Sequence, residues 1–99
     1  MIKRIVKLSF LPEKTSDFLL IFEDMKTRIR GFEGCNHLEL WRSRSEPHIF
    51  FTFSIWDSEA HLDAYRKSEM FQQTWIRTKA LFAEPAMAWS VDTLEAVNF

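Results

Sequence analysis

The sequence predicts an α+β domain in which helices cover one face of an antiparallel sheet. Several segments alternate apolar and polar residues with a period of two, as strands do. The segments between them repeat apolar residues every three or four positions, as helices do. The connections between these segments are short, and 99 residues make one domain, residues 1–99. These observations together favour a small layered domain.

The first predicted strand covers residues 2–10, and the first predicted helix covers residues 13–30. In the strand, Ile5 lies on one face. The other face is formed by Arg4, Val6, Leu8 and Phe10. In the helix, a stripe with spacings of four, three and four is formed by Phe18, Phe22, Met25 and Ile29. Gly31 is placed to end this helix.

Residues 35–42 and 48–56 alternate again and are predicted to pair as an antiparallel hairpin. Residues 58–67 and the segment after Ser68 are predicted to be helical, with Asp57 or Ser58 and then Ser68 as capping residues. Residues 86–94 return to a strand pattern. The resulting order, β-α-β-β-α-(α)-β, is that of the ferredoxin-like fold.

Both faces of the predicted sheet are partly apolar, although helices are expected on one face only. We predict that Phe51 and Phe53 lie on the face of the sheet that the helices cover. The opposite face would then carry Ile5, Trp41, Phe50 and Trp56. Several large apolar side chains exposed together indicate an interface. We therefore expect a homodimer whose sheets pack face to face.

Composition and charge exclude several classes of function. The 13 basic and 14 acidic residues give a net charge of −1, and no basic stripe is present, so nucleic-acid binding is not expected. No apolar run is long enough to span a membrane, and no secretory signal is recognised. The single cysteine, Cys35, cannot form an internal disulfide. The expected location is the cytoplasm.

Two stretches resemble the antibiotic biosynthesis monooxygenase family. Residues 34–40, Gly-Cys-Asn-His-Leu-Glu-Leu, are similar to its Gly-Cys…Glu-Leu segment. Residues 51–60 are similar to its strand-Trp-Asp-Ser-x-x-Ala segment, and residues 62–71 continue the similarity into the helices. The resemblance implies a dimeric α/β barrel. Its monooxygenase members need no cofactor or metal, and they oxidise a small hydroxylated aromatic substrate with dioxygen.

The resemblance implies a cavity between sheet and helices, and candidate residues can be named for it. Tyr65 and His61 are four positions apart on one helix, so they can share a face as hydrogen-bond donor and proton acceptor. The expected substrate-binding residues are Trp75, Phe51, Phe53 and Phe71. The alternative interpretation makes His61 a solvated residue and the aromatic residues plain core.

Other candidate sites are weaker. His37, Glu39 and His48 lack the spacing of a known metal motif, so no metal site is expected. Arginines 42, 44 and 66 could bind an anionic group but are more often solvated. The resemblance also extends to haem-degrading members, which have a helix Trp, an iron-ligating His ten positions later and an Asn on the first strand. Haem degradation is not expected here, because the corresponding positions hold Tyr65 and Trp75 and the first strand has no Asn. Three hypotheses remain: a cofactor-independent monooxygenase, a non-oxidative isomerase, and a small-molecule-binding dimer without turnover.

Overall fold

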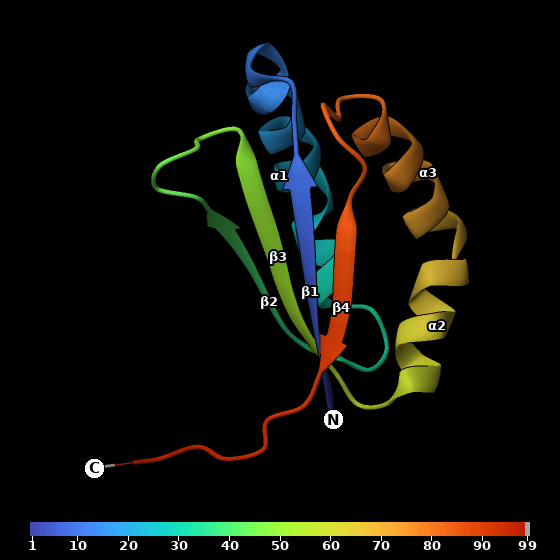
Figure 1. Ribbon diagram of the computed structural model, residues 1–99. Helices are drawn as coiled ribbons and strands as arrows, with labels where there is room; N and C mark the ends of the chain where they lie inside the picture. The colour runs from blue at the N-terminus through green and yellow to red at the C-terminus, as the bar shows by residue number, and fades with distance from the viewer. Residues whose placement is uncertain (99) are drawn as a thin grey trace.

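The computed structural model describes residues 1–98 and has the predicted order of elements (Figure 1). The chain runs through β1 (Ile2–Ser9), the short 3-10 helix η1 (Pro12–Lys14), α1 (Thr15–Arg30), β2 (Cys35–Arg42), β3 (Ile49–Trp56), α2 (Glu59–Lys67), α3 (Glu69–Lys79) and β4 (Met87–Val91). The third helix, left open by the sequence, is therefore a separate element.

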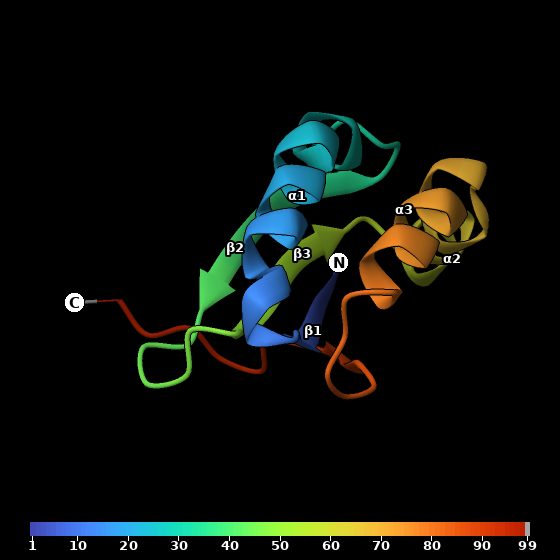
Figure 2. The ribbon, with the colours of Figure 1, turned by 90° about the horizontal axis from the view of Figure 1, so that it is seen from above.

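The sheet is four-stranded, with the order β2-β3-β1-β4. Each neighbouring pair is antiparallel. This is the ferredoxin-like arrangement, and it confirms the predicted fold class. The sheet is open, and Figure 2 shows α1 and the α2–α3 pair on the same side of it. A cavity lies between this layer of helices and the sheet.

Local sequence explains where the helices begin and end. Gly31 ends α1, and its N–H donates to the Thr27 carbonyl at 2.9 Å. Ser58 caps α2 by accepting from the His61 N–H, and Ser68 caps α3 by accepting from the Phe71 N–H. Each cap satisfies a backbone donor that the first turn leaves free. Both predicted serine caps are confirmed.

The predicted assignment of the β3 side chains to the two faces of the sheet was wrong. Phe50 and Trp56 are each 1% exposed and lie on the helix side, in the core. Phe53 pairs with Ile5, and Phe51 pairs with Trp41. Paired residues share a face, so these side chains point away from the helices. The reason for the error is that both faces of β3 carry large apolar residues, and alternation alone does not say which face is covered.

The apolar core has two clusters under the helices. One contains Leu8, Phe10, Phe18 and Phe50. The other contains Cys35, Trp56 and Leu62. Within residues 1–98, no helix is both long and apolar enough to cross a membrane. After β4, residues 92–98 lead away from the body of the molecule (Figure 1).

Candidate functional site

A cavity of about 290 Å³ lies between the sheet and the helices. Every strand contributes to its lining: β1 through Val6, β2 through Leu38, β3 through Thr52 and β4 through Ala88. The helices close it from the other side with residues of α1, α2 and α3. Its volume is near the lower end of about 300–1,000 Å³ for ligand pockets. A ligand of one or two rings fits this size.

One wall of the cavity is a continuous series of aromatic rings. Tyr65 stacks on Trp56 with ring centroids 4.8 Å apart, and meets Phe71 edge-on at 5.0 Å. Phe71 stacks on Trp75 at 5.7 Å and an interplanar angle of 14°. All of these residues line the cavity. Flat rings beside a cavity offer stacking and edge contacts to a flat ligand.

Tyr65 adds a hydroxyl group to this wall. Its ring is enclosed by Trp56, Phe71 and, at 5.4 Å, Phe32. Burial, with a smaller effect of the neighbouring Cys35, raises the pKa of the Tyr65 phenol well above its usual value. At neutral pH the residue is therefore a neutral hydrogen-bond donor and not a base.

Further polar groups enter from the sheet. Ser54 is buried, and its oxygen accepts the Trp56 indole N–H at 2.9 Å, which leaves the Ser54 hydroxyl hydrogen free to donate. Arg4 lies beside Ser54 in the register of β1 and β3 and lines the same cavity. Arg66 of α2 also lines it. The cavity thus combines apolar rings with hydroxyl and guanidinium donors.

Among residues 1–98, the side chains that line the cavity include no group that accepts a proton at neutral pH. Among the described residues that line the cavity there is no His, Asp or Glu. Residues 1–98 also hold no group of three or more His, Cys, Asp or Glu that could bind a metal ion. The side chains of this cavity can therefore stabilise an oxyanion by donation, but they cannot take up its proton.

His61 lies outside the cavity, so the expected pair with Tyr65 is not formed. Its ring Nδ1 is 2.7 Å from the Ser58 hydroxyl, and its side chain packs against Gly34. It lines a separate surface hollow with Phe32. The reason is helical geometry: Leu62, Tyr65 and Arg66 make the cavity stripe, and residue 61 is turned about 100° from residue 62.

Of the four residues expected to bind a substrate, two line the cavity and two do not. Trp75 and Phe71 line the cavity, as expected. Phe51 and Phe53 do not, because they lie on the opposite face of the sheet. The expectation that these two side chains bind a substrate in this cavity was therefore wrong. On that opposite face, Phe53 stacks against Trp41 at 5.2 Å.

The outer face of the sheet, which is the side away from the helices, carries a hydrogen-bonded group of side chains. The Glu39 carboxylate accepts from Trp41 Nε1 at 2.8 Å and contacts His37 Nε2. The hydrogen bonds from His37 and then Trp41 hold the pKa of Glu39 below its usual value. His48 is not part of this group, in agreement with the absence of a metal cluster within the described residues.

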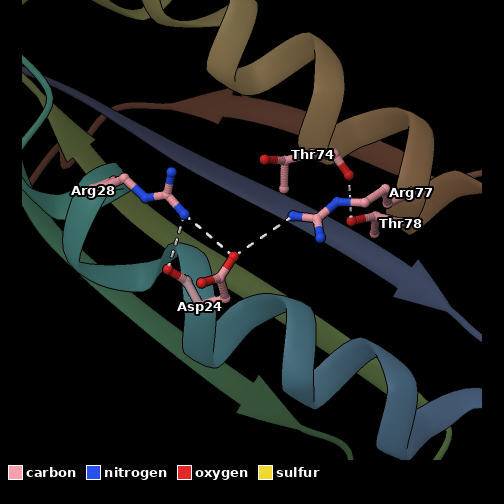
Figure 3. A network of polar contacts seen from close by, with 5 residues as sticks. All are labelled: Asp24, Arg28, Thr74, Arg77 and Thr78. Atoms are coloured by element: carbon pink, nitrogen blue, oxygen red, sulfur yellow. Dashed lines mark hydrogen bonds and ion pairs between the residues drawn. The ribbon is translucent and has the colours of Figure 1, made fainter.

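An ion-pair network joins α1 and α3, and both helices contribute residues to the cavity lining (Figure 3). Asp24 of α1 pairs with Arg28 at 3.2 Å and faces Arg77 of α3 at 3.9 Å. In α3, the Thr78 hydroxyl donates to the Thr74 carbonyl at 2.8 Å, and both threonines line the cavity. The two ion pairs are exposed and contribute little to stability, whereas the Thr78 side chain is buried.

Sequence reasoning missed Arg4, Ser54 and Trp56 as cavity residues. A signal for Arg4 was present, because it is the only charged residue on the face shared by Val6 and Leu8. A charged residue on an otherwise apolar strand face is unusual, and it indicates a binding site or a buried ion pair. No comparable signal marked Ser54 or Trp56, since large apolar residues occur on both faces of β3.

Comparison with known proteins gives a consistent result. The family model for antibiotic biosynthesis monooxygenase matches residues 1–75. A search of curated proteins finds no match. Among solved structures, an antibiotic biosynthesis monooxygenase superposes with a TM-score of 0.90 at 20% identity, covering 96% of this chain and 100% of that one.

Two further structures show the same fold. A protein from Mycobacterium tuberculosis has a TM-score of 0.87 at 20% identity, covering 98% of each chain. A conserved protein from Methanosarcina mazei has a TM-score of 0.87 at 19% identity, covering 91% of this chain and 89% of that one. At these identities the structural likeness is evidence of the fold alone.

Proposed function

From the premise that this chain belongs to the antibiotic biosynthesis monooxygenase family, we propose that it oxidises a small hydroxylated aromatic compound with dioxygen and no cofactor. The observation that carries the proposal is the cavity wall of Trp56, Tyr65, Phe71 and Trp75. This wall can stack a flat quinol while Tyr65 donates a hydrogen bond to one of its oxygens.

The proposed reaction depends on electrons supplied by the substrate itself. A quinol and dioxygen give a hydroxyquinone and water. Two electrons come from oxidation of the quinol to the quinone, and two come from replacement of a ring C–H bond by C–O. One oxygen atom enters the product, and the other leaves as water with two hydrogens. No external reductant is needed.

The role of the protein is to stabilise the electron-rich anion of the substrate. A phenolate transfers an electron to oxygen more readily than a phenol. Tyr65 stays protonated at neutral pH, so it can donate to the phenolate oxygen, and the free Ser54 hydroxyl hydrogen can do the same. Because no lining side chain accepts a proton, the hydroxyl proton passes to water at the mouth of the cavity.

The test is oxygen consumption by chelator-treated protein with a panel of quinols and polyphenols. Superoxide dismutase and catalase are added to suppress autoxidation, and boiled protein is the control. We expect uptake above the control, and with isotopically labelled dioxygen we expect one labelled atom in the product. Binding of the same quinols is measured separately in oxygen-free buffer by tryptophan fluorescence.

The alternatives give different results in the same experiment. A quinol that binds but takes up no labelled oxygen would contradict the monooxygenase proposal. Conversion of a bound ligand without oxygen would support an isomerase, and binding with no product would support a ligand-binding protein. The oxygen-free binding measurement therefore separates loss of turnover from loss of binding.

We also propose a homodimer through the outer face of the sheet. Trp41 is 40% exposed there and Trp89 is 43% exposed, beside Phe51 and Ile5. Single exposed apolar residues are ordinary, but a contiguous group of this kind is typical of an interface. The two aromatic rings and their neighbours would be covered by the same face of a second copy.

A further inference from the structure

The cavity holds a cation that the proposed oxidation of a neutral quinol does not use. Arg4 is half-buried on the helix side of β1, on the same face as Val6 and Leu8. Its neighbours across the strands are Ser54 on β3 and Ser90 on β4. A charged side chain on a partly buried apolar face is costly unless it has a partner.

Within residues 1–98, Arg4 has no such anionic partner. Its guanidinium donates to the Ser90 hydroxyl at 3.1 Å, and among residues 1–98 no carboxylate lies within 4.0 Å of it. Guanidinium carries five N–H donors, so most of its donor capacity remains free. The Ser54 hydroxyl beside it also has a hydrogen to donate.

The charged residues nearest Arg4 are of both signs. Arg66 of α2 lines the cavity together with Arg4. Burial, followed by the repulsion of Arg66, lowers the pKa of Arg4, whereas Glu59 and Asp63 raise it. Those two acidic residues are on α2, and neither forms an ion pair with Arg4. Two guanidinium groups at one cavity suit an anion.

We propose that the ligand of this cavity carries an acidic group, a carboxylate attached to the aromatic ring, and that Arg4 binds it. The planar guanidinium can hold a carboxylate through two parallel N–H···O bonds, and the hydroxyl of Ser54 adds a third donor. Arg66 contributes a second positive charge nearby. This inference rests on the proposed function for the choice of cavity and ring, but not for the occurrence of oxidation.

The acidic group gives the ligand one fixed end. The aromatic wall of Tyr65, Phe71 and Trp75 receives the ring, and the sheet side holds the charge. A ligand held in this way presents one ring edge to the Tyr65 hydroxyl. A neutral quinol of the same size lacks this constraint and leaves Arg4 without an anionic partner, so it should bind more weakly.

The test is calorimetric binding in oxygen-free buffer with a matched pair of probes, 2,5-dihydroxybenzoate and 2,5-dihydroxybenzamide. The probes share ring and hydroxyl groups and differ in charge. We expect the carboxylate to bind at least about tenfold more tightly, as a charge-assisted pair would provide. Equal affinity of the two probes, or binding of neither, would overturn the proposal without any variant.

Variants then assign the preference to Arg4. Arg4→Met keeps a long apolar stem and should lower the affinity for the carboxylate at least about tenfold, which removes its preference over the amide. Arg44→Met removes an equal charge from the exposed turn between β2 and β3 and should leave both affinities unchanged. Arg4→Lys, which keeps a charge, should retain part of the preference. A preference that survives in folded Arg4→Met protein would contradict the assignment.

These results are separate from the test of oxidation. If neutral quinols consume oxygen but the carboxylate shows no preference, the acidic-group inference fails and the proposed function stands. If the carboxylate binds through Arg4 but no quinol or dihydroxybenzoate takes up labelled oxygen, the proposed function fails and the binding inference stands.

Discussion

Tyr65 is the single tyrosine of the chain, so its ionisation can be followed directly by the ultraviolet absorbance of tyrosinate. Its pKa is raised in the folded protein by burial, whereas in an unfolded chain tyrosine ionises near pH 10. The unfolded state therefore loses its proton first, and the folded protein should become less stable as pH rises above about 10. Tyrosinate should form only with unfolding. Reversible ionisation near pH 10 in folded protein would contradict this.

The different placements of Tyr65 and His61 predict different effects on turnover. Tyr65→Phe removes a donor from the cavity and should lower turnover on the order of 10²-fold, since donors to a developing oxyanion have effects of this size. His61→Gln changes a residue outside the cavity and should leave turnover within about twofold. Oxygen uptake on one quinol measures both, with thermal unfolding as the check on folding. Equal losses in the two variants would contradict the site described here.

At the scale of elements, the break between α2 and α3 positions the aromatic wall. Ser68 lies at the break, where its hydroxyl donates to the Tyr65 carbonyl at 2.6 Å and accepts from the Phe71 N–H at 3.1 Å. This one side chain therefore joins the end of α2 to the start of α3. It also sets the spacing between two rings that line the cavity.

Ser68→Ala should lower the free energy of unfolding by about 1 kcal/mol, the usual effect of losing an N-cap. Ser16→Ala changes an exposed serine of α1 and serves as the control, with an expected change within about 0.5 kcal/mol. Urea unfolding of both variants measures the difference. Equal stability of Ser68→Ala and the unmodified protein would show that the serine does not hold the two helices together.

At the scale of the whole molecule, the outer face of the sheet should determine the oligomeric state. Trp41→Glu places a carboxylate among Phe51, Phe53 and their neighbours, close to the existing Glu39 carboxylate. Burying this charge in an interface is costly, so the variant should be a monomer. Analytical ultracentrifugation of the variant and the unmodified protein measures this.

Leu20→Glu provides a matched control for that substitution. Leu20 is an exposed apolar residue of α1 on the other side of the sheet, so its replacement should leave the oligomeric state unchanged. A dimer that persists in folded Trp41→Glu protein would place the interface elsewhere. Dissociation of the Leu20→Glu protein would implicate the helical side instead.

The sequence by itself determined the order of elements and much of their length. Alternation identified every strand, a helical stripe identified α1, and serines marked the starts of α2 and α3, because these signals are local. Trp75, Phe71 and Tyr65 were recognised as candidate cavity residues, and the family was recognised from the segments around residues 34–40 and 51–60.

Only the tertiary structure decided which face of β3 meets the helices. Phe50 and Trp56 became core, and Phe51 and Phe53 became outer-face residues. A strand with large apolar residues on both sides takes its orientation from the register with β1 and β2. The same packing put His61 against Gly34 and turned Arg4 toward the cavity. The two-residue period of a strand separates its side chains into two faces. Which of these faces is buried depends on the elements that pack against it.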